Sequence, residues 1–160
     1  FNIQIQAGEH FHINGNTSII FMFSANKGNE MQELSRVASG GELSRLMLAI
    51  KYITAKESKI YTLIFDEIDS GVSGEIASLM GDMMREISNS NQLIAISHLP
   101  QIASKSKTHL KVMKEIIENE TVSSVKELDQ QERIDEIAKL LSGKELTQAA
   151  ISNAIELLNQ

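Results

Sequence analysis

The sequence contains no cysteine, no tryptophan and a single proline among its 160 residues. The absence of cysteine excludes disulfide bonds and thiolate metal ligands, and it fits a cytoplasmic protein. No apolar run approaches the ~20 residues that a membrane-spanning helix needs, and nothing resembles a signal peptide. From these absences we expect a soluble protein without a membrane partner.

Basic residues are also scarce, since 15 Lys and Arg are outnumbered by 21 Asp and Glu, for a net charge of -6. Nucleic-acid backbones are bound mainly by Lys and Arg, so a broad nucleic-acid surface is excluded and any DNA contact is local or made elsewhere. The 42% of apolar residues suffices for one core of ordinary domain size. No repeat or linker divides the chain, so we predict a single domain over residues 1–160. Because the first residue is Phe1 rather than Met, we expect an excerpt or a processed product.

The first third of the chain has the pattern of a β-hairpin. Residues 1–6, "FNIQIQ", alternate apolar and polar side chains, which is typical of a half-buried strand. Asn14-Gly15 predicts a type I′ turn, and the segment 17–24 after it, "TSIIFMFS", is rich in β-branched and aromatic residues.

A helix is predicted after this hairpin, over residues 40–53. Leu43, Met47 and Ile50 recur at helical spacing and define its expected apolar face.

The start of this helix carries two adjacent glycines, Gly40 and Gly41. Glycine is a poor helix former, but here it leaves the unpaired backbone N–H groups at the positive end of the helix dipole open to an anion such as phosphate. Ser39 as N-cap with Glu42 three residues later also forms a capping box. A plain capped turn is therefore an alternative to a phosphate site.

Two apolar strands flank a helix in the middle of the chain. The strands "YTLIF" and "QLIAIS", with a helix predicted over about 75–88, are typical of a parallel α/β sheet that is buried on both faces. Polar pairs follow the two strands, namely Asp66-Glu67 and Ser97-His98. Ligands of open α/β sheets bind outside the carboxyl ends of the strands.

These polar residues suit the chemistry of phosphate transfer to water. Asp66 could hold Mg²⁺, usually through water, while Glu67 orients or deprotonates an attacking water. Asp69 follows in a turn, and a neutral His98 could donate to a terminal phosphate oxygen. Taken singly, each has an ordinary alternative: a solvated acidic loop, a turn, or a histidine bonded to the backbone.

The last third predicts two strands, "THLKVMKE" and "TVSSVKEL", followed by two helices. Asp129 with Glu132 forms a capping box for the first helix, Gly143 ends it, and Thr147 begins the second.

Two further groups of residues are typical of an ordinary protein surface. His10 and His12 share one side of a strand, but a third metal ligand is lacking nearby, so we interpret them as a solvated hairpin face. Lys105, Lys107 and Lys111 form a small basic patch, which we interpret as surface while leaving contact with a DNA backbone open.

In combination and in this order, the motifs resemble the C-terminal lobe of ABC-type ATPase heads. In that resemblance Ser39, Gly40, Gly41 and Glu42 match the signature motif. Thr62–Glu67 matches the Walker B strand with its catalytic glutamate, Asp69 the D-loop, and His98 the switch histidine. The stretches "VASGGELSRLMLAIK", "TLIFDEIDSGVSGEIA" and "ISHLPQIAS" are similar to the SMC-like branch of this superfamily that acts in bacterial DNA repair.

The resemblance implies Mg²⁺-dependent ATP hydrolysis by a P-loop ATPase head, in which Glu67 and His98 are catalytic and Asp66 is near the metal. The chain has no GxxxxGK[ST] motif, and the family carries this Walker A motif in an N-terminal lobe beyond a coiled-coil hairpin. We therefore expect half a head with a mostly parallel sheet, inactive alone. The implied partners are its own Walker A lobe, a second head in a homodimer that encloses ATP, and DNA ends or single-stranded tails at the bacterial nucleoid.

Three alternatives stay open at this point. One is an SMC or cohesin-type structural chromosome head, and another is the nucleotide-binding subunit of an ABC transporter. The third is a catalytically silent module that only binds a partner.

Overall fold

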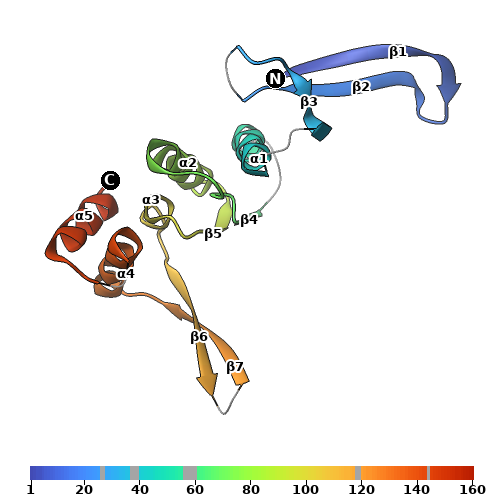
Figure 1. Cartoon of the computed structure of the whole chain (residues 1–160). Helices are drawn as coiled ribbons and strands as arrows, with labels where there is room; N and C mark the ends of the chain where they lie inside the picture. Colours follow the sequence, from blue (N-terminus) through green and yellow to red (C-terminus); the bar gives the residue numbers. More distant parts are fainter. Residues whose placement is uncertain (26–27, 37–39, 56–60, 118–119, 144) are drawn as a thin grey trace. The chain divides into compact units, whose positions relative to one another are not determined.

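The computed structural model describes residues 1–25, 28–36, 40–55, 61–117, 120–143 and 145–160 (Figure 1). These residues form two compact units, Phe1–Met47 and Leu48–Gln160. The boundary lies within helix α1 (Gly40–Ala55), whose start belongs to the first unit and whose end belongs to the second. The single domain predicted over residues 1–160 stays a prediction, because compactness alone does not define an independently folding domain.

The first unit is a small antiparallel sheet. Its elements are β1 (Asn2–His12), β2 (Gly15–Phe23), β3 (Gln32–Glu33) and the 3₁₀ helix η1 (Leu34–Arg36). The predicted hairpin is confirmed, but its turn lies at Ile13 and Asn14, because Gly15 already pairs with His12. Among the described residues Glu67 is the one non-glycine with a positive φ, so Asn14 lacks the φ of a type I′ turn and Gly15, at φ 95°, supplies the left-handed residue instead.

The half-buried strand predicted at the N-terminus is wrong in its burial. Every residue of β1 is exposed, and Ile3 and Ile5 are 51% and 70% exposed. Period-two alternation marks a strand with one apolar face, but burial also requires a second layer, and the described elements of this unit provide none.

The second unit contains the predicted α/β element. Strand β4 (Thr62–Asp66) pairs in parallel with β5 (Gln92–Ile96), and α2 (Gly74–Ile87) connects them. This α/β prediction is confirmed, but the mostly parallel sheet is too broad a description, because the other described strand pairs are antiparallel.

One face of the parallel pair is buried and the other is bare. A core joins β4, α1, α2 and α3 through the buried side chains of Leu48, Ala55, Leu63, Phe65, Ile68, Met80, Met84, Ile87 and Ile102. On the opposite face Ile64, Ile94 and Ile96 are 66%, 43% and 55% exposed. The expectation of burial on both faces is therefore wrong for the described chain.

Helix α1 buries a different face from the one predicted. Leu48 and Ala55 are buried, whereas Leu43, Met47 and Ile50 are 43%, 46% and 39% exposed. The helix is apolar on two sides, so periodicity alone did not identify the side that meets the core.

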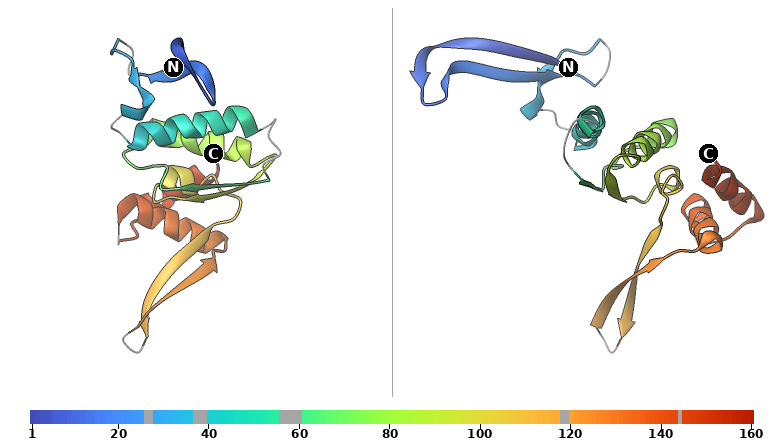
Figure 2. Two further views of the ribbon diagram at one scale, coloured as in Figure 1. Left: turned by 90° about the vertical axis from the view of Figure 1, so that its right-hand side faces the viewer. Right: turned by 180° about the vertical axis from the view of Figure 1, so that it is seen from behind.

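The remaining elements build a helical layer and a projecting hairpin. They are α3 (Pro100–Ala103), β6 (Leu110–Ile117), β7 (Glu120–Glu127), α4 (Gln130–Ser142) and α5 (Gln148–Leu158). The two strands and the capping box of Asp129 with Glu132 are confirmed. Helices α4 and α5 share a second core of Ile137, Ala138, Ala150 and Ala154. Figure 2 shows the β6–β7 hairpin extending away from these helices in both views.

Candidate functional site

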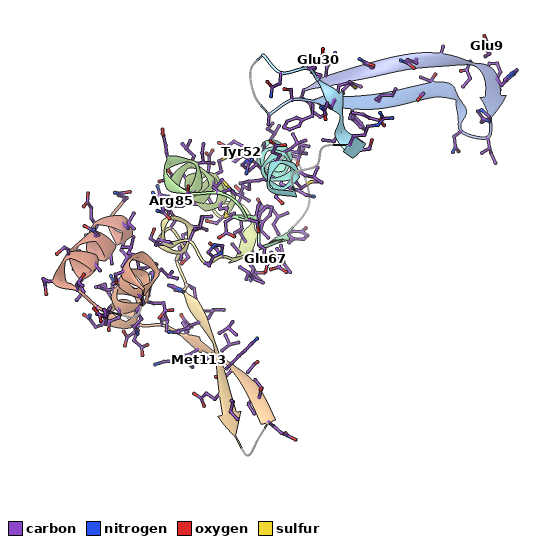
Figure 3. The ribbon with its side chains drawn as sticks, viewed as in Figure 1. Glu9, Glu30, Tyr52, Glu67, Arg85 and Met113 are labelled. Carbon is purple, nitrogen blue, oxygen red and sulfur yellow. The ribbon has the colours of Figure 1, made fainter. Side chains whose placement is uncertain are left out.

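The two carboxylates after the Walker B-like strand lie at the end of β4. Asp66 is the last residue of the strand and is exposed on the same face as Ile64. Glu67, labelled in Figure 3, is also exposed and has a φ of 48°, which is in the left-handed region. Successive side chains of an extended strand point to opposite sides, but at Glu67 the left-handed residue itself turns the backbone out of the strand. Such a conformation costs about 1–2 kcal/mol for a residue with a β-carbon, and strain of this kind concentrates at functional sites.

The ends of β4 and β5 coincide. Asp66 pairs with Ile96, so Glu67 and Ser97 leave the sheet at the same edge, and His98 follows at once. The parallel register therefore brings the strand-end residues singled out in the sequence to one edge, as open α/β sites require.

A buried carboxylate connects these two strand ends. The side chain of Asp69 is fully buried, and its Oδ2 accepts hydrogen bonds from the Ser97 hydroxyl at 2.5 Å and from the His98 backbone N–H at 3.2 Å. The Ser97 Oγ in turn accepts from the Leu99 N–H at 3.0 Å. The His98 side chain is 73% exposed, and its Nδ1 is 3.5 Å from the same Asp69 oxygen.

The sequence did not indicate these contacts. The resemblance matches Asp69 to the D-loop and thereby implies a place at the nucleotide, which stays a prediction, although its Oδ2 is occupied within the protein. Ser97 received no role, and the one signal that could have identified it is its place between an apolar strand and His98. The Oδ1 of Asp69 is buried and has no hydrogen-bond partner among the described residues.

The glycine-started helix is present, and Gly40 is its first residue. A β-carbon built at Gly40 would meet no atom within 4 Å, so packing within the described chain does not require glycine there. Glu42 lies in the first turn of the helix. Ser39 lies outside the described residues, so its predicted capping box with Glu42 has no structural test.

The residues at the strand ends fit a magnesium ion that is bound mainly by its substrate. In the described part of the chain no group of three His, Asp or Glu side chains could hold a metal together. Mg²⁺ is typically held by one or two carboxylates with phosphates and water rather than by an all-protein cage. Asp66, an exposed carboxylate at the site edge, suits that mode.

The small basic patch of Lys105, Lys107 and Lys111 offers little free charge for a DNA backbone, because acidic partners neutralise two of its members. Lys105 pairs with Asp82 at 2.9 Å and its side chain is only 7% exposed, while Lys111 pairs with Glu136. Lysines bound to carboxylates of the same chain are poor ligands for a phosphate backbone.

The imidazole of His109 lies beside this group of charges. Burial, and then the nearby Arg133 guanidinium, lower the pKa of His109 below its ordinary value. His109 is therefore neutral near pH 7 and adds no positive charge to this surface.

No helix within the described ranges is long and apolar enough to cross a membrane.

Comparison with known proteins finds relatives by sequence and solved structures of similar fold. No protein-family model matches the chain. The sequence is 42% identical to the DNA repair protein RecN of Rickettsia felis over 159 residues, which is 99% of this chain and 29% of that protein. It is 43% identical to RecN of Bacillus subtilis over 140 residues, or 88% of this chain and 24% of that protein. The chain thus spans less than a third of the length of these relatives.

Solved structures show the same fold at low sequence identity. The Smc head domain with coiled coil and joint from Pyrococcus yayanosii superposes with a TM-score of 0.64 and 20% identity, over 82% of this chain and 23% of that chain. A structure from work on ATP-driven dimerisation and DNA-stimulated activation of SMC ATPases matches with a TM-score of 0.55 and 17% identity, over 89% of this chain and 84% of that chain. With the fold of an SMC head domain and with sequence similarity along its whole length, the chain belongs to the RecN family, whose C-terminal part it matches.

Proposed function

We propose that this chain is the C-terminal lobe of an ATPase head that acts in the repair of DNA double-strand breaks. It supplies the signature helix and the Walker B carboxylates for Mg²⁺-dependent ATP hydrolysis between paired heads. The relatives are named DNA repair proteins, which favours this role over a chromosome-structural head or a transporter subunit. As the chain spans only part of those relatives, repair activity, ATP and DNA are assigned to the full-length protein.

The observation that carries the proposal is the shared edge of the parallel strands. Asp66 and Glu67 leave β4 where Ser97 and His98 leave β5, and Glu67 is held in a conformation that costs energy. In this proposal a carboxylate for Mg²⁺, a second carboxylate for water and an imidazole for phosphate come from one edge of the sheet, which supports hydrolysis of a nucleotide bound there.

The signature glycines have a separate part in the proposal. Nothing in the described chain approaches the place of a β-carbon on Gly40, so the reason for glycine lies outside it. We assign Ser39, Gly40, Gly41 and Glu42 to the γ-phosphate of an ATP molecule held by a second head. The free N–H groups of the first helical turn bind the anion, and the missing side chains allow its close approach.

The uncovered face of the β4–β5 pair favours a head that is completed by a second lobe outside residues 1–160. Ile64, Ile94 and Ile96 present a contiguous apolar face, and Asp66 lies on the same face. A metal-binding carboxylate beside uncovered apolar side chains fits a site that a Walker A lobe completes. We therefore expect residues 1–160 alone to hydrolyse ATP negligibly.

The test is a pair of substitutions in the full-length protein. Asp66→Asn is expected to weaken Mg²⁺-dependent ATP binding, because a neutral amide replaces a carboxylate near a hard cation. Glu67→Gln is expected to leave ATP affinity within a few-fold while slowing hydrolysis by roughly 10²- to 10⁴-fold, the scale of losing a general base, and to accumulate paired heads.

The readouts are ATP affinity, turnover and the oligomeric state with ATP. Glu127→Gln, an exposed carboxylate at the end of β7, is the matched control and should behave like the parent. Parental turnover by Glu67→Gln would remove Glu67 as the base, and robust hydrolysis by residues 1–160 alone would overturn the half-head assignment.

A further inference from the structure

A single carboxylate oxygen binds two consecutive residues at the end of β5 and reaches a third through the Ser97 hydroxyl. The Asp69 Oδ2 accepts from the Ser97 hydroxyl and from the His98 N–H, and Ser97 Oγ accepts from the Leu99 N–H. Ser97 is therefore a donor and an acceptor at once, and it links the loop after β4 to the chain that carries His98.

The environment makes these bonds strong. The Asp69 side chain is fully buried, and hydrogen bonds to a charged group in a site that excludes water are stronger than bonds between neutral, exposed groups. The Ser97 side chain is itself part-buried, whereas the His98 side chain is 73% exposed. An exposed imidazole has few contacts to fix its position, so its placement depends on the backbone that carries it.

We propose that the hydrogen-bonded pair of Ser97 and Asp69, here called the latch, positions His98 for the phosphate of the nucleotide. Ser97 is a positioning residue that acts through His98 and does not contact the ligand. The inference rests on the proposed function, because it needs His98 to act on the nucleotide. It gives Asp69 a role inside the head, where its buried oxygen connects the Walker B loop to the switch histidine.

The latch also restricts the imidazole. The Asp69 Oδ2 lies 3.5 Å from the His98 Nδ1, so the carboxylate that binds the His98 backbone also lies beside its ring. Loss of the Ser97 hydroxyl would release one donor from this oxygen and let the strand end and the ring move together. The expected consequence is a slower catalytic step with little change in nucleotide affinity, since binding is made mainly by other groups.

A double-mutant cycle in the full-length protein tests the latch, with Ser97→Ala, His98→Ala and the double variant. Ser97→Ala should lower kcat by about 10-fold or more, the scale of losing a hydrogen bond to a charged group, while KM for ATP changes less than about threefold. Because Ser97 acts through His98, adding Ser97→Ala to His98→Ala should lower kcat by less than about twofold more.

Two further variants separate positioning from general stability. Ser97→Thr keeps the hydroxyl and should restore kcat to within about threefold of the parent. Ser104→Ala is the matched control, because Ser104 is a buried serine whose hydroxyl, among the described residues, bonds its own helix turn at Gln101, and it should leave kcat unchanged. If Ser97→Ala does not fold, Ser97→Cys replaces it in the cycle, since it keeps the volume and has only a weak donor.

The outcomes distinguish the two proposals. If His98→Ala lowers kcat but Ser97→Ala does not, or if the two effects multiply, the latch is overturned while the proposed function stands. If His98→Ala itself leaves kcat unchanged, the role of His98 in the proposed function fails and the latch fails with it.

Discussion

At the scale of single residues, Glu67 combines an expected catalytic role with an unfavourable backbone conformation. Its φ of 48° is a region that glycine adopts freely and that residues with a β-carbon avoid. Its side chain is exposed, so packing does not account for a non-glycine residue there. The conformation is stabilised by neighbours, since Ser70 N–H bonds the Glu67 carbonyl and Val72 N–H bonds the Asp69 carbonyl.

A comparison of Glu67→Gly with Glu67→Ala measures this strain. Both variants lack the carboxylate and should lose hydrolysis, but only glycine relieves the left-handed strain. After allowing for the greater flexibility of glycine in the unfolded chain, we expect Glu67→Gly to be more stable than Glu67→Ala by about 0.5–1 kcal/mol. Denaturant unfolding of the two variants gives this difference directly. An alanine variant of equal or greater stability would show that the Glu67 backbone is not strained.

At the scale of elements, the crossing of α2 and α3 depends on Gly81. A β-carbon there would lie 2.9 Å from the Gln101 carbonyl oxygen and 3.1 Å from Lys105 Cγ. The first neighbour is backbone and cannot move without shifting α3. Lys105 also pairs with Asp82 of α2 at 2.9 Å, so the close approach and the ion pair belong to one contact.

Gly81→Ala is therefore expected to destabilise the protein, although alanine favours an isolated helix. The helix propensity gained, about 1 kcal/mol, is opposed by a clash whose relief typically costs about 1–3 kcal/mol. Gly40→Ala is the matched control, because its β-carbon would meet nothing within 4 Å, and it should be neutral or slightly stabilising. Thermal unfolding of both variants checks the prediction, and a Gly81→Ala protein as stable as the Gly40→Ala protein would contradict it.

The helices and strands also show which features sequence patterns can predict and which they cannot. Helix starts and ends follow from local chemistry, so the capping box at Asp129 and the helix end at Gly143 were predictable. The strand-end positions of Asp66 and His98 followed from apolar runs that stop at polar residues. The burial of Asp69 and its bond to Ser97 did not, because they depend on the register of two strands that lie far apart in the sequence.

The same limit applies to apolar faces that no described element covers. Alternation in β1 and the apolar side of α1 at Leu43 and Met47 predicted burial, yet both are exposed. A pattern records that a face is apolar, whereas its burial depends on which other segment lies against it. The neutralisation of the lysine patch was not predictable for a related reason, since Asp82 pairs with Lys105 only in the folded chain.

At the scale of the whole molecule, the uncovered face of β4 and β5 presents three exposed isoleucines in a chain with net charge -6. Exposed contiguous apolar patches mark interaction sites in soluble proteins. Since the chain matches only 24–29% of the length of the relatives described above, we expect the rest of the full-length protein to cover Ile64, Ile94 and Ile96.

Ile94→Glu tests this cover by comparing two proteins. In residues 1–160 alone the side chain is 43% exposed, so a charge there should cost little stability and should raise solubility. In the full-length protein the same substitution would bury an unpaired carboxylate, and we expect a destabilisation of about 3 kcal/mol or more with loss of ATP hydrolysis. Ile13→Glu, at the fully exposed hairpin turn, is the control and should be tolerated in both proteins. If the full-length Ile94→Glu protein unfolds and hydrolyses ATP like the parent, this face is not covered by the remainder of the chain, and the completion of the site from that side is wrong.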